Sequence, residues 1–149
     1  MTAQFTNINS GAGLNAGTTL DIGTITEEET ISNFGTTAIP ITFTGPEGTY
    51  TYNLQGGERY IMIRGYKFDT TASYESNLRD FTEDLQKIGN YQNTAVSGAW
   101  FTYQNTKSKI KDIYNGVVVK MVDLRISDSN RNPQNVINYV IRLIQTKAD

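Results

Sequence analysis

The stretch "KMVDLRISDSNRNPQNVINYVIRLIQ", residues 120–145, has two apolar segments on either side of eight turn-forming residues. The turn segment, Ser127–Gln134, consists mostly of Ser, Asp, Asn and Pro, the residue types that favour turns. The flanking segments are rich in Val, Ile, Leu and Tyr, as β-strands usually are. The chain is therefore expected to end in a pair of strands, and nothing in this stretch suggests catalysis.

The first of these segments, "VVVKMVDLRIS" (117–127), changes the phase of its apolar alternation. The apolar positions are Val117, Val119 and Met121 and then Val122, Leu124 and Ile126. A slip of one residue within a strand predicts a β-bulge or a sharp bend. The alternative is a strand that is covered on both faces.

The last segment, "QNVINYVIRLIQ", fits two periods. Helical spacing is met by Val136, Val140, Leu143 and Ile144, and strand alternation is met by Ile137, Tyr139, Ile141 and Leu143. Pro133 could open a helix. Because six of the nine residues from 136 to 144 are β-branched or aromatic, we favour a strand.

Earlier in the chain, three strand-like segments alternate with tight turns. The segments cover 39–44, 49–54 and 58–68, and "GPEG" (45–48) and "QGG" (55–57) separate them. Short loops between successive strands predict an antiparallel meander of three strands. A further strand is expected at "GAWFTY", and a hairpin turn at Asn-Gly in 115–116.

One segment has helical rather than strand periodicity. Apolar residues recur at spacings of 3, 4 and 3 in "SYESNLRDFTEDLQKIGN", namely at Leu78, Phe81, Leu85 and Ile88. Ser73 or Ser76 can cap the start. The chain is therefore expected to be mostly β, with a single helix at about 74–88.

The N-terminal third has a different composition. Residues 1–38 are rich in Gly, Thr, Asn and Ser, and only "TTLDIGTIT" (18–26) alternates like a short strand, with a break at Gly23. Residues 5–17 contain too few large apolar side chains to order themselves. We expect a flexible or partner-ordered arm over 1–38 and a single β-rich domain over 39–149.

The composition removes the commonest catalytic and metal-binding groups. The 149 residues include no Cys and no His, so a thiolate nucleophile, an imidazole base and the usual zinc ligands are absent. The near-fingerprint "GAGLNAG" (11–17) has no strand before it and no helix after it. No enzyme, no cofactor, no metal, no signal peptide and no membrane span are expected, and synthesis and assembly are expected in a cytoplasm.

Charge is divided unevenly along the chain. Residues 1–57 hold five acids and no base, and residues 58–149 hold ten acids and thirteen bases. The acids Glu27, Glu28 and Glu29 are contiguous, and on a strand Lys107, Lys109 and Lys111 would share one face. Opposite patches favour head-to-tail contact between copies. The alternatives are surfaces that contact only solvent, lysines that prevent unwanted pairing at a strand edge, or lysines that contact phosphate groups.

The order of these elements resembles the small structural proteins of phage tails. The resemblance rests on the strand with its phase slip, the Asn132-Pro133 turn and the last strand, which alternates around Tyr139. The segment "ERYIMIRGYKFDTTAS" followed by the single helix also fits that group. The resemblance covers roughly residues 58–145.

The resemblance implies a tail-tube-like antiparallel β-sandwich or half-barrel with one flanking helix. It also implies a tail tube, baseplate hub or adaptor protein of a virion, assembled in the host cytoplasm. Its copies would form a ring, expected to be hexameric, with neighbouring tail proteins as partners and DNA only as cargo in a channel. Subunit contacts are expected at Glu27, Glu28, Glu29, Lys107, Lys109, Lys111, Ile137, Tyr139 and Ile141.

Two other functions remain open. One is a monomeric β-sandwich binding module for a glycan or a peptide, with Trp100 and Tyr103 as a carbohydrate platform. The other is a small hydrolase that uses carboxylates alone, which would need two acids from different strands to converge.

Overall fold

The computed structural model describes residues 3–8, 17–33, 37–42, 49–54, 58–89, 100–110, 118–128 and 134–145. The expected hairpin turn at 115–116 and most of the Asn-Pro turn lie outside these residues. The elements are β1 (Ala3–Ile8), β2 (Thr18–Asn33), β3 (Thr37–Thr42), β4 (Thr49–Leu54), β5 (Glu58–Phe68), α1 (Tyr74–Ile88), β6 (Trp100–Gln104), β7 (Val118–Ser127) and β8 (Val136–Gln145).

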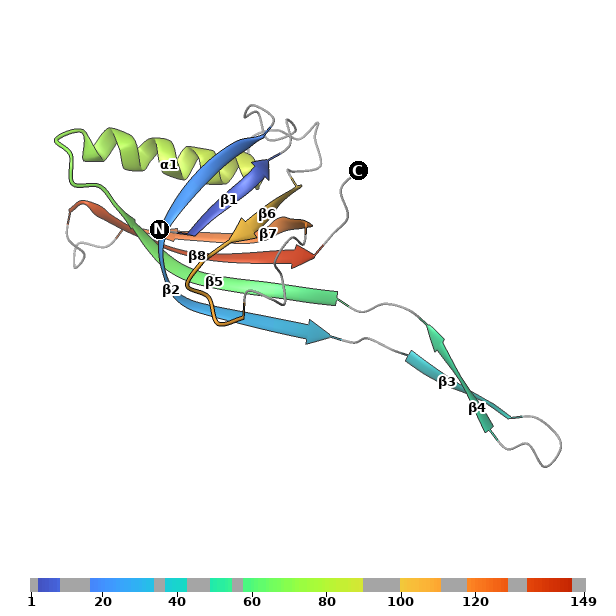
Figure 1. Ribbon diagram of the computed structural model, residues 1–149. Coiled ribbons are helices and arrows are strands. Elements are labelled where there is room, and N and C mark those ends of the chain that lie inside the picture. Colours follow the sequence, from blue (N-terminus) through green and yellow to red (C-terminus); the bar gives the residue numbers. More distant parts are fainter. Residues whose placement is uncertain are drawn as a thin grey trace.

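Six strands form a closed antiparallel barrel in the order β1-β2-β5-β8-β7-β6 (Figure 1). The barrel closes because β1 pairs with β2 on one edge and with β6 on the other. The expected mostly β chain with a single helix is confirmed among the described residues. The expected sandwich or half-barrel is wrong, since every barrel strand has two strand neighbours.

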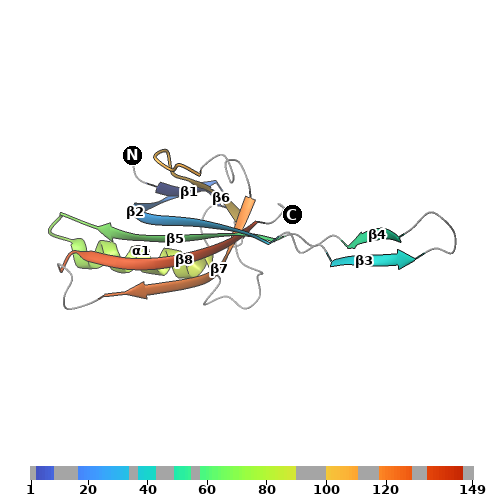
Figure 2. The same cartoon turned by 90° about the horizontal axis from the view of Figure 1, so that it is seen from below.

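The helix is found where its apolar spacing placed it. Its bounds, Tyr74–Ile88, match the expected 74–88, and its buried residues are Leu78, Phe81, Leu85 and Ile88. Phe81 lies against the ring of Tyr139 on β8, with the ring centroids 6.1 Å apart. The helix thus adds a set of side chains to the barrel core from one side (Figures 1 and 2).

The C-terminal strands pair as the opening stretch predicts. Strand β8 covers Val136–Gln145, so the choice of strand over helix is confirmed for this segment. The register with β7 shifts between Met121 and Asp123, which confirms the bulge predicted from the phase slip. Val122 is the extra residue, and it is 51% exposed.

The expected three-strand meander is wrong. β3 pairs with β4 in a separate two-stranded sheet, the β3–β4 ribbon. β5 does not accept β4, because β2 occupies one edge of β5 and β8 occupies the other. Figures 1 and 2 both show the β3–β4 ribbon standing away from the barrel, beyond the ends of β2 and β5.

The N-terminal residues contribute to the barrel. Within the expected arm, residues 3–8 form β1 and residues 18–33 form the whole of the longest strand, β2. Phe5, Ile8 and Ile22 are fully buried. The few apolar residues of this segment are sufficient to order it, because its backbone also pairs with distant strands. The division of the chain at residue 38 stays a prediction.

Strand β2 changes partner at Gly23. Its first part, up to Gly23, pairs with β1, and its second part, from Thr24, pairs with β5. Gly23 has a φ of 84°, and a Cβ at this position would lie 2.3 Å from the carbonyl oxygen of Tyr66. Only glycine fits both the backbone conformation and this close approach of two strands.

Strand β2 bends at Gly23, where it changes partner. Tyr139 on β8 holds this bend from the other side of β5. Tyr139 and Gly65 are paired residues of β8 and β5. A Cβ on Gly65 would lie 2.9 Å from the Tyr139 hydroxyl oxygen. The hydroxyl therefore passes over Gly65 and donates a hydrogen bond to the carbonyl oxygen of Ile22. Burial, followed by the charge of Asp21, raises the pKa of Tyr139 above its ordinary value of 10.0, so this group is a neutral donor.

We expect Tyr139→Phe to lower the free energy of unfolding by about 1–3 kcal/mol, because the buried carbonyl of Ile22 loses its donor. Urea unfolding followed by circular dichroism measures this change. Tyr66→Phe is the matched control, since no hydrogen bond from the Tyr66 hydroxyl is recorded among the described residues. Equal unfolding midpoints for Tyr139→Phe and wild type would show that the Tyr139 hydroxyl does not hold the bend.

Candidate functional site

The second part of β2 presents an open strand edge. From Thr24 to Asn33 this strand pairs with β5 on one edge. On its other edge no described strand is paired with it, because β1 stops pairing at Gly23. Glu27, Glu28 and Glu29 lie in this open part, and charged residues on an unpaired edge oppose uncontrolled strand addition.

Glu28 is a fixed, partly buried group. Its carboxylate accepts hydrogen bonds from the Tyr103 hydroxyl at 2.8 Å, from the Asn105 side-chain amide and from the Ser108 hydroxyl. Tyr103 belongs to β6, whereas Asn105 and Ser108 belong to the loop that follows it. The Glu28 carboxylate therefore holds this loop, residues 105–110, against β2.

The neighbouring glutamates behave differently from Glu28. Glu27 forms an ion pair with Arg64 across the β2–β5 ladder, with a distance of 3.4 Å between Oε2 and Nε, and both side chains are more than half exposed. Such a pair contributes little to stability. Glu29 is exposed. The three contiguous acids are therefore one structural group and two surface groups, rather than a single patch.

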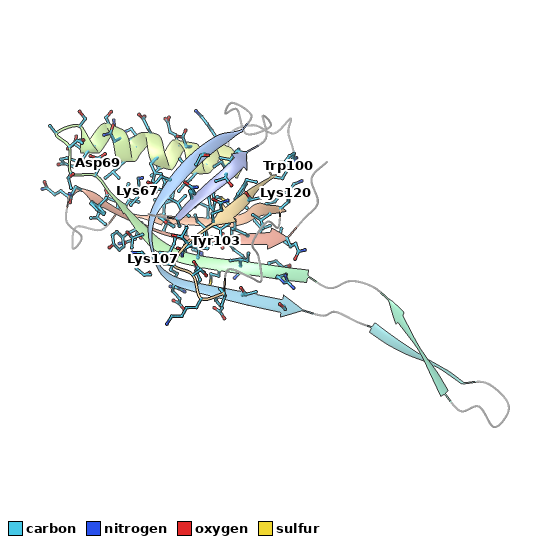
Figure 3. The ribbon with its side chains drawn as sticks, viewed as in Figure 1. Lys67, Asp69, Trp100, Tyr103, Lys107 and Lys120 are labelled. Carbon is cyan, nitrogen blue, oxygen red and sulfur yellow. The ribbon has the colours of Figure 1, made fainter. Side chains whose placement is uncertain are left out.

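Lys107 and Lys109 are exposed on the loop over residues 105–110, which we call the lysine loop. This segment contains turns and bends, so the expectation that its lysines alternate on a strand is wrong for these two. Lys111 lies outside the described residues. Lys107 and Lys109 line a hollow of about 260 Å³ together with Glu27 and Glu28. The expected acidic and basic patches therefore share one surface of the chain, near the labelled Lys107 (Figure 3).

The apolar contact residues expected on the last strand belong to the core. Ile137, Tyr139 and Ile141 are 9%, 1% and 0% exposed. Strand alternation was predicted correctly, but these three side chains point into the barrel. The same strand directs Val140 and Arg142 outward, and Arg142 is exposed. The C-terminal strand can therefore meet a neighbour only through its outward-facing positions.

The carbohydrate platform is not formed. Trp100 and Tyr103 are separated by three positions on β6, which places them on opposite faces of the strand. Tyr103 is 1% exposed and donates to Glu28, and Trp100 is half-buried elsewhere on the barrel (Figure 3).

A second polar cluster surrounds Asp69, between β5 and α1. Its carboxylate accepts hydrogen bonds from the Thr71 amide at 2.8 Å, the Thr71 hydroxyl at 2.5 Å and the Asn77 side-chain amide at 2.8 Å. Ser73, one of the two expected caps, makes no side-chain capping bond. The sequence signal for the true arrangement is the Asp-x-Thr spacing ahead of the helix, which is typical of such local turns.

Two more observations limit the chemistry of the described residues. They contain no group of three His, Cys, Asp or Glu side chains that could hold a metal ion. They also contain no helix of the length and apolarity that crossing a bilayer demands. A groove of about 450 Å³ lies between the end of α1 and the bulge of β7, lined by Gln86, Gly89, Met121, Val122, Asp123, Leu124 and Ile126.

Comparison with known proteins gives no family. No family model matches the chain, and no curated protein matches it. A chain of the solved "Virion of native gene transfer agent (GTA) particle" is 9% identical, has a TM-score of 0.40 and covers 87% of this chain and 85% of its own length. A chain of the "Tail of empty GTA particle computed with helical refinement, C6 symmetry" is 12% identical, with a TM-score of 0.38 and coverage of 96% and 92%. Likeness at this level does not establish common membership of a family.

We expect Glu28→Gln to loosen the lysine loop. The amide cannot accept from three donors as a carboxylate does, so the loop amides should exchange with solvent about tenfold faster, which corresponds to about 1.4 kcal/mol. Hydrogen exchange at Ser108 and Ile110, whose amides are bonded within the loop, measures this opening. Glu29→Gln, a change of the same kind at an exposed position, should leave the exchange unchanged. Equal exchange in Glu28→Gln and wild type would show that the Glu28 carboxylate does not hold the lysine loop, a role that we call the Glu28 clamp.

We expect Asp69 to make stability depend on pH on the acidic side. The hydrogen bonds from the Thr71 side chain, the Thr71 backbone and Asn77 lower the pKa of Asp69 from its usual 3.8. A carboxylate with a lowered pKa stabilises the fold above the usual value and loses this effect as the pH falls through the lowered one. Asp69→Asn should therefore be less stable than wild type at about pH 6, and the difference should vanish near about pH 2.

Thermal unfolding between these pH values tests the Asp69 prediction, with Asp84→Asn as the control. Burial raises the pKa of Asp84, so neutralising this group should not destabilise the fold at neutral pH. A constant difference between wild type and Asp69→Asn at all pH values would contradict the assigned role.

Proposed function

We propose that this protein is a structural, non-catalytic subunit of a phage tail or a related injection machine, in a tail tube, baseplate hub or adaptor. Its copies assemble into a ring through strand pairing and charge complementarity. The observation that carries the proposal is the β3–β4 ribbon, which stands away from the barrel (Figures 1 and 2).

The β3–β4 ribbon is poorly suited to stand alone. It consists of two strands of six residues each, paired from Thr37↔Leu54 to Thr42↔Thr49. An isolated two-stranded sheet is marginally stable in water. Neither outer edge of the ribbon is paired within the described part of the chain, so its backbone donors and acceptors are free to pair with a neighbouring subunit.

The open part of β2 offers a second edge for such pairing. Its exposed acids, Glu27 and Glu29, repel a strand that carries negative charge and favour one that carries positive charge. An edge guarded in this way accepts a selected partner rather than any exposed strand. A subunit that must assemble in order needs this selectivity.

The resemblance of residues 58–145 to phage tail proteins supplies the remaining parts of the proposal. These are a virion location, assembly in the host cytoplasm, a ring of six copies, neighbouring tail proteins as partners and DNA as passing cargo. The alternative is a monomeric binding module. Because Tyr103 is buried, it cannot contribute to a platform for a glycan. The competing function is therefore a module that binds a peptide strand along the open edge of β2.

The experiment compares the full chain with a variant that lacks the β3–β4 ribbon. Asn33 and Glu58 face each other across the β2–β5 ladder, so an Asn-Gly turn can join them in place of residues 34–57. We expect the full chain to form rings or tubes, and the shortened chain to keep the barrel but remain monomeric. Light scattering after size exclusion and negative-stain images measure assembly, and thermal unfolding checks the barrel.

A full chain that stays monomeric at every concentration would contradict the proposal and favour the binding module. If the shortened chain formed rings equally well, the ring would be supported but the β3–β4 ribbon would not be one of its contacts.

A further inference from the structure

The lysine loop and the acids nearest to it cannot be the two halves of a ring contact. Lys107, Lys109, Glu27 and Glu28 line one hollow on one side of the barrel. A surface that carries both signs suits a self-complementary contact across a two-fold axis, and such a contact closes a dimer. A ring requires two different surfaces that meet head to tail.

Glu27 and Glu28 are also already engaged within the chain. Glu28 accepts three hydrogen bonds from the Tyr103, Asn105 and Ser108 side chains. Glu27 forms its ion pair with Arg64. The exposed charges of the lysine loop are therefore available to an acidic partner surface elsewhere.

The outward side of α1 provides that surface. Four acids and two bases lie within Tyr74–Ile88. Asp80, Glu83 and Asp84 are close in space, and no ion pair with a described residue is recorded for them. Burial raises the pKa of Asp84, Lys87 lowers it, and the charges of Asp80 and Glu83 raise it. We call these three residues the acidic helix face.

The two surfaces lie on opposite sides of the barrel. In Figure 1 the helix runs above the barrel strands, and the loop that continues β6 descends away from the helix to the level of β2. Figure 2, turned by 90°, again shows barrel strands between the loop and α1. Figure 3 places the labelled Lys107 on the side away from α1. A head-to-tail contact repeated around a ring needs two separate surfaces of this kind on each copy.

We propose that the lysine loop of one copy docks on the acidic helix face of the next copy. This inference rests on the ring assembly of the proposed function and identifies the surfaces that form its lateral contact. The Glu28 clamp fixes the loop before docking, so little conformational freedom is lost when the lysines meet the helix. Charge complementarity then orients neighbouring copies and speeds their encounter.

The test uses charge reversal on each surface of the full chain. Lys107→Glu with Lys109→Glu reverses the lysine loop, and Asp80→Lys with Glu83→Lys reverses the exposed part of the acidic helix face. Each double variant alone should require at least tenfold more protein to form rings. An equimolar mixture of the two should assemble better than either alone, since both contact types of a ring in which the variants alternate pair opposite charges.

Two controls separate docking from folding. Lys120→Glu makes the same kind of charge change on β7, away from the lysine loop (Figure 3), and should assemble like wild type. Lys107→Gln with Lys109→Gln removes the charges without placing new carboxylates beside Glu28. This variant should show a smaller loss of assembly and unchanged thermal unfolding.

The outcomes distinguish this inference from the proposed function. Wild-type rings with unaffected assembly in both reversed variants would overturn the contact while leaving the ring in place. A wild-type chain that never assembles would overturn both. Rings that weaken in each reversed variant and recover in the mixture would support the contact, and rising salt should weaken wild-type assembly in the same experiment.

Discussion

The barrel depends on the hydrogen bond from the Tyr139 hydroxyl to the carbonyl oxygen of Ile22. This bond lies at the point where β2 leaves β1 and joins β5. Two glycines make it sterically feasible, because Gly23 takes a positive φ and Gly65 leaves room for the tyrosine ring. Asp21 adds a further tie, since its carboxylate accepts from the Gly23 amide at 2.8 Å and lies 3.7 Å from the Lys67 ammonium. The last strand thus fastens a bend near the start of the chain.

The bend of β2 determines where the surface groups lie. Once β2 has turned at Gly23, its second part has β5 on one edge only, and Glu28 can reach the loop after β6. Glu28 and the packing of Ile110 against the core together hold that loop on the barrel. A buried tyrosine and a partly buried glutamate therefore help to position two exposed lysines. The same bend directs β2 and β5 outward, toward the β3–β4 ribbon (Figure 1).

Local features of this fold could be predicted from the sequence, and long-range ones could not. The helical spacing of apolar residues from Leu78 to Ile88 predicts α1, and the phase slip at Val122 predicts the bulge. Both signals arise within one element. The closure of the barrel and the isolation of the β3–β4 ribbon depend on which strand takes each edge of β5. Short turns suggested that sequential neighbours would pair, whereas β2 and β8 compete for the same edges and leave no place for β4.

Charge along the sequence was a misleading guide to charge on the surface. The first 57 residues carry five acids and no base, which suggested an acidic patch that meets a basic patch on another copy. The fold instead places Glu27 and Glu28 beside Lys107 and Lys109, because β2 and the loop after β6 lie on the same side of the barrel. Charges that are segregated along the chain therefore lie side by side on this surface. A group of acids that is separated from the lysine loop in space lies on α1, in the half of the chain that looked basic. The contact that we propose between copies rests on this spatial separation and not on the order of charges in the sequence.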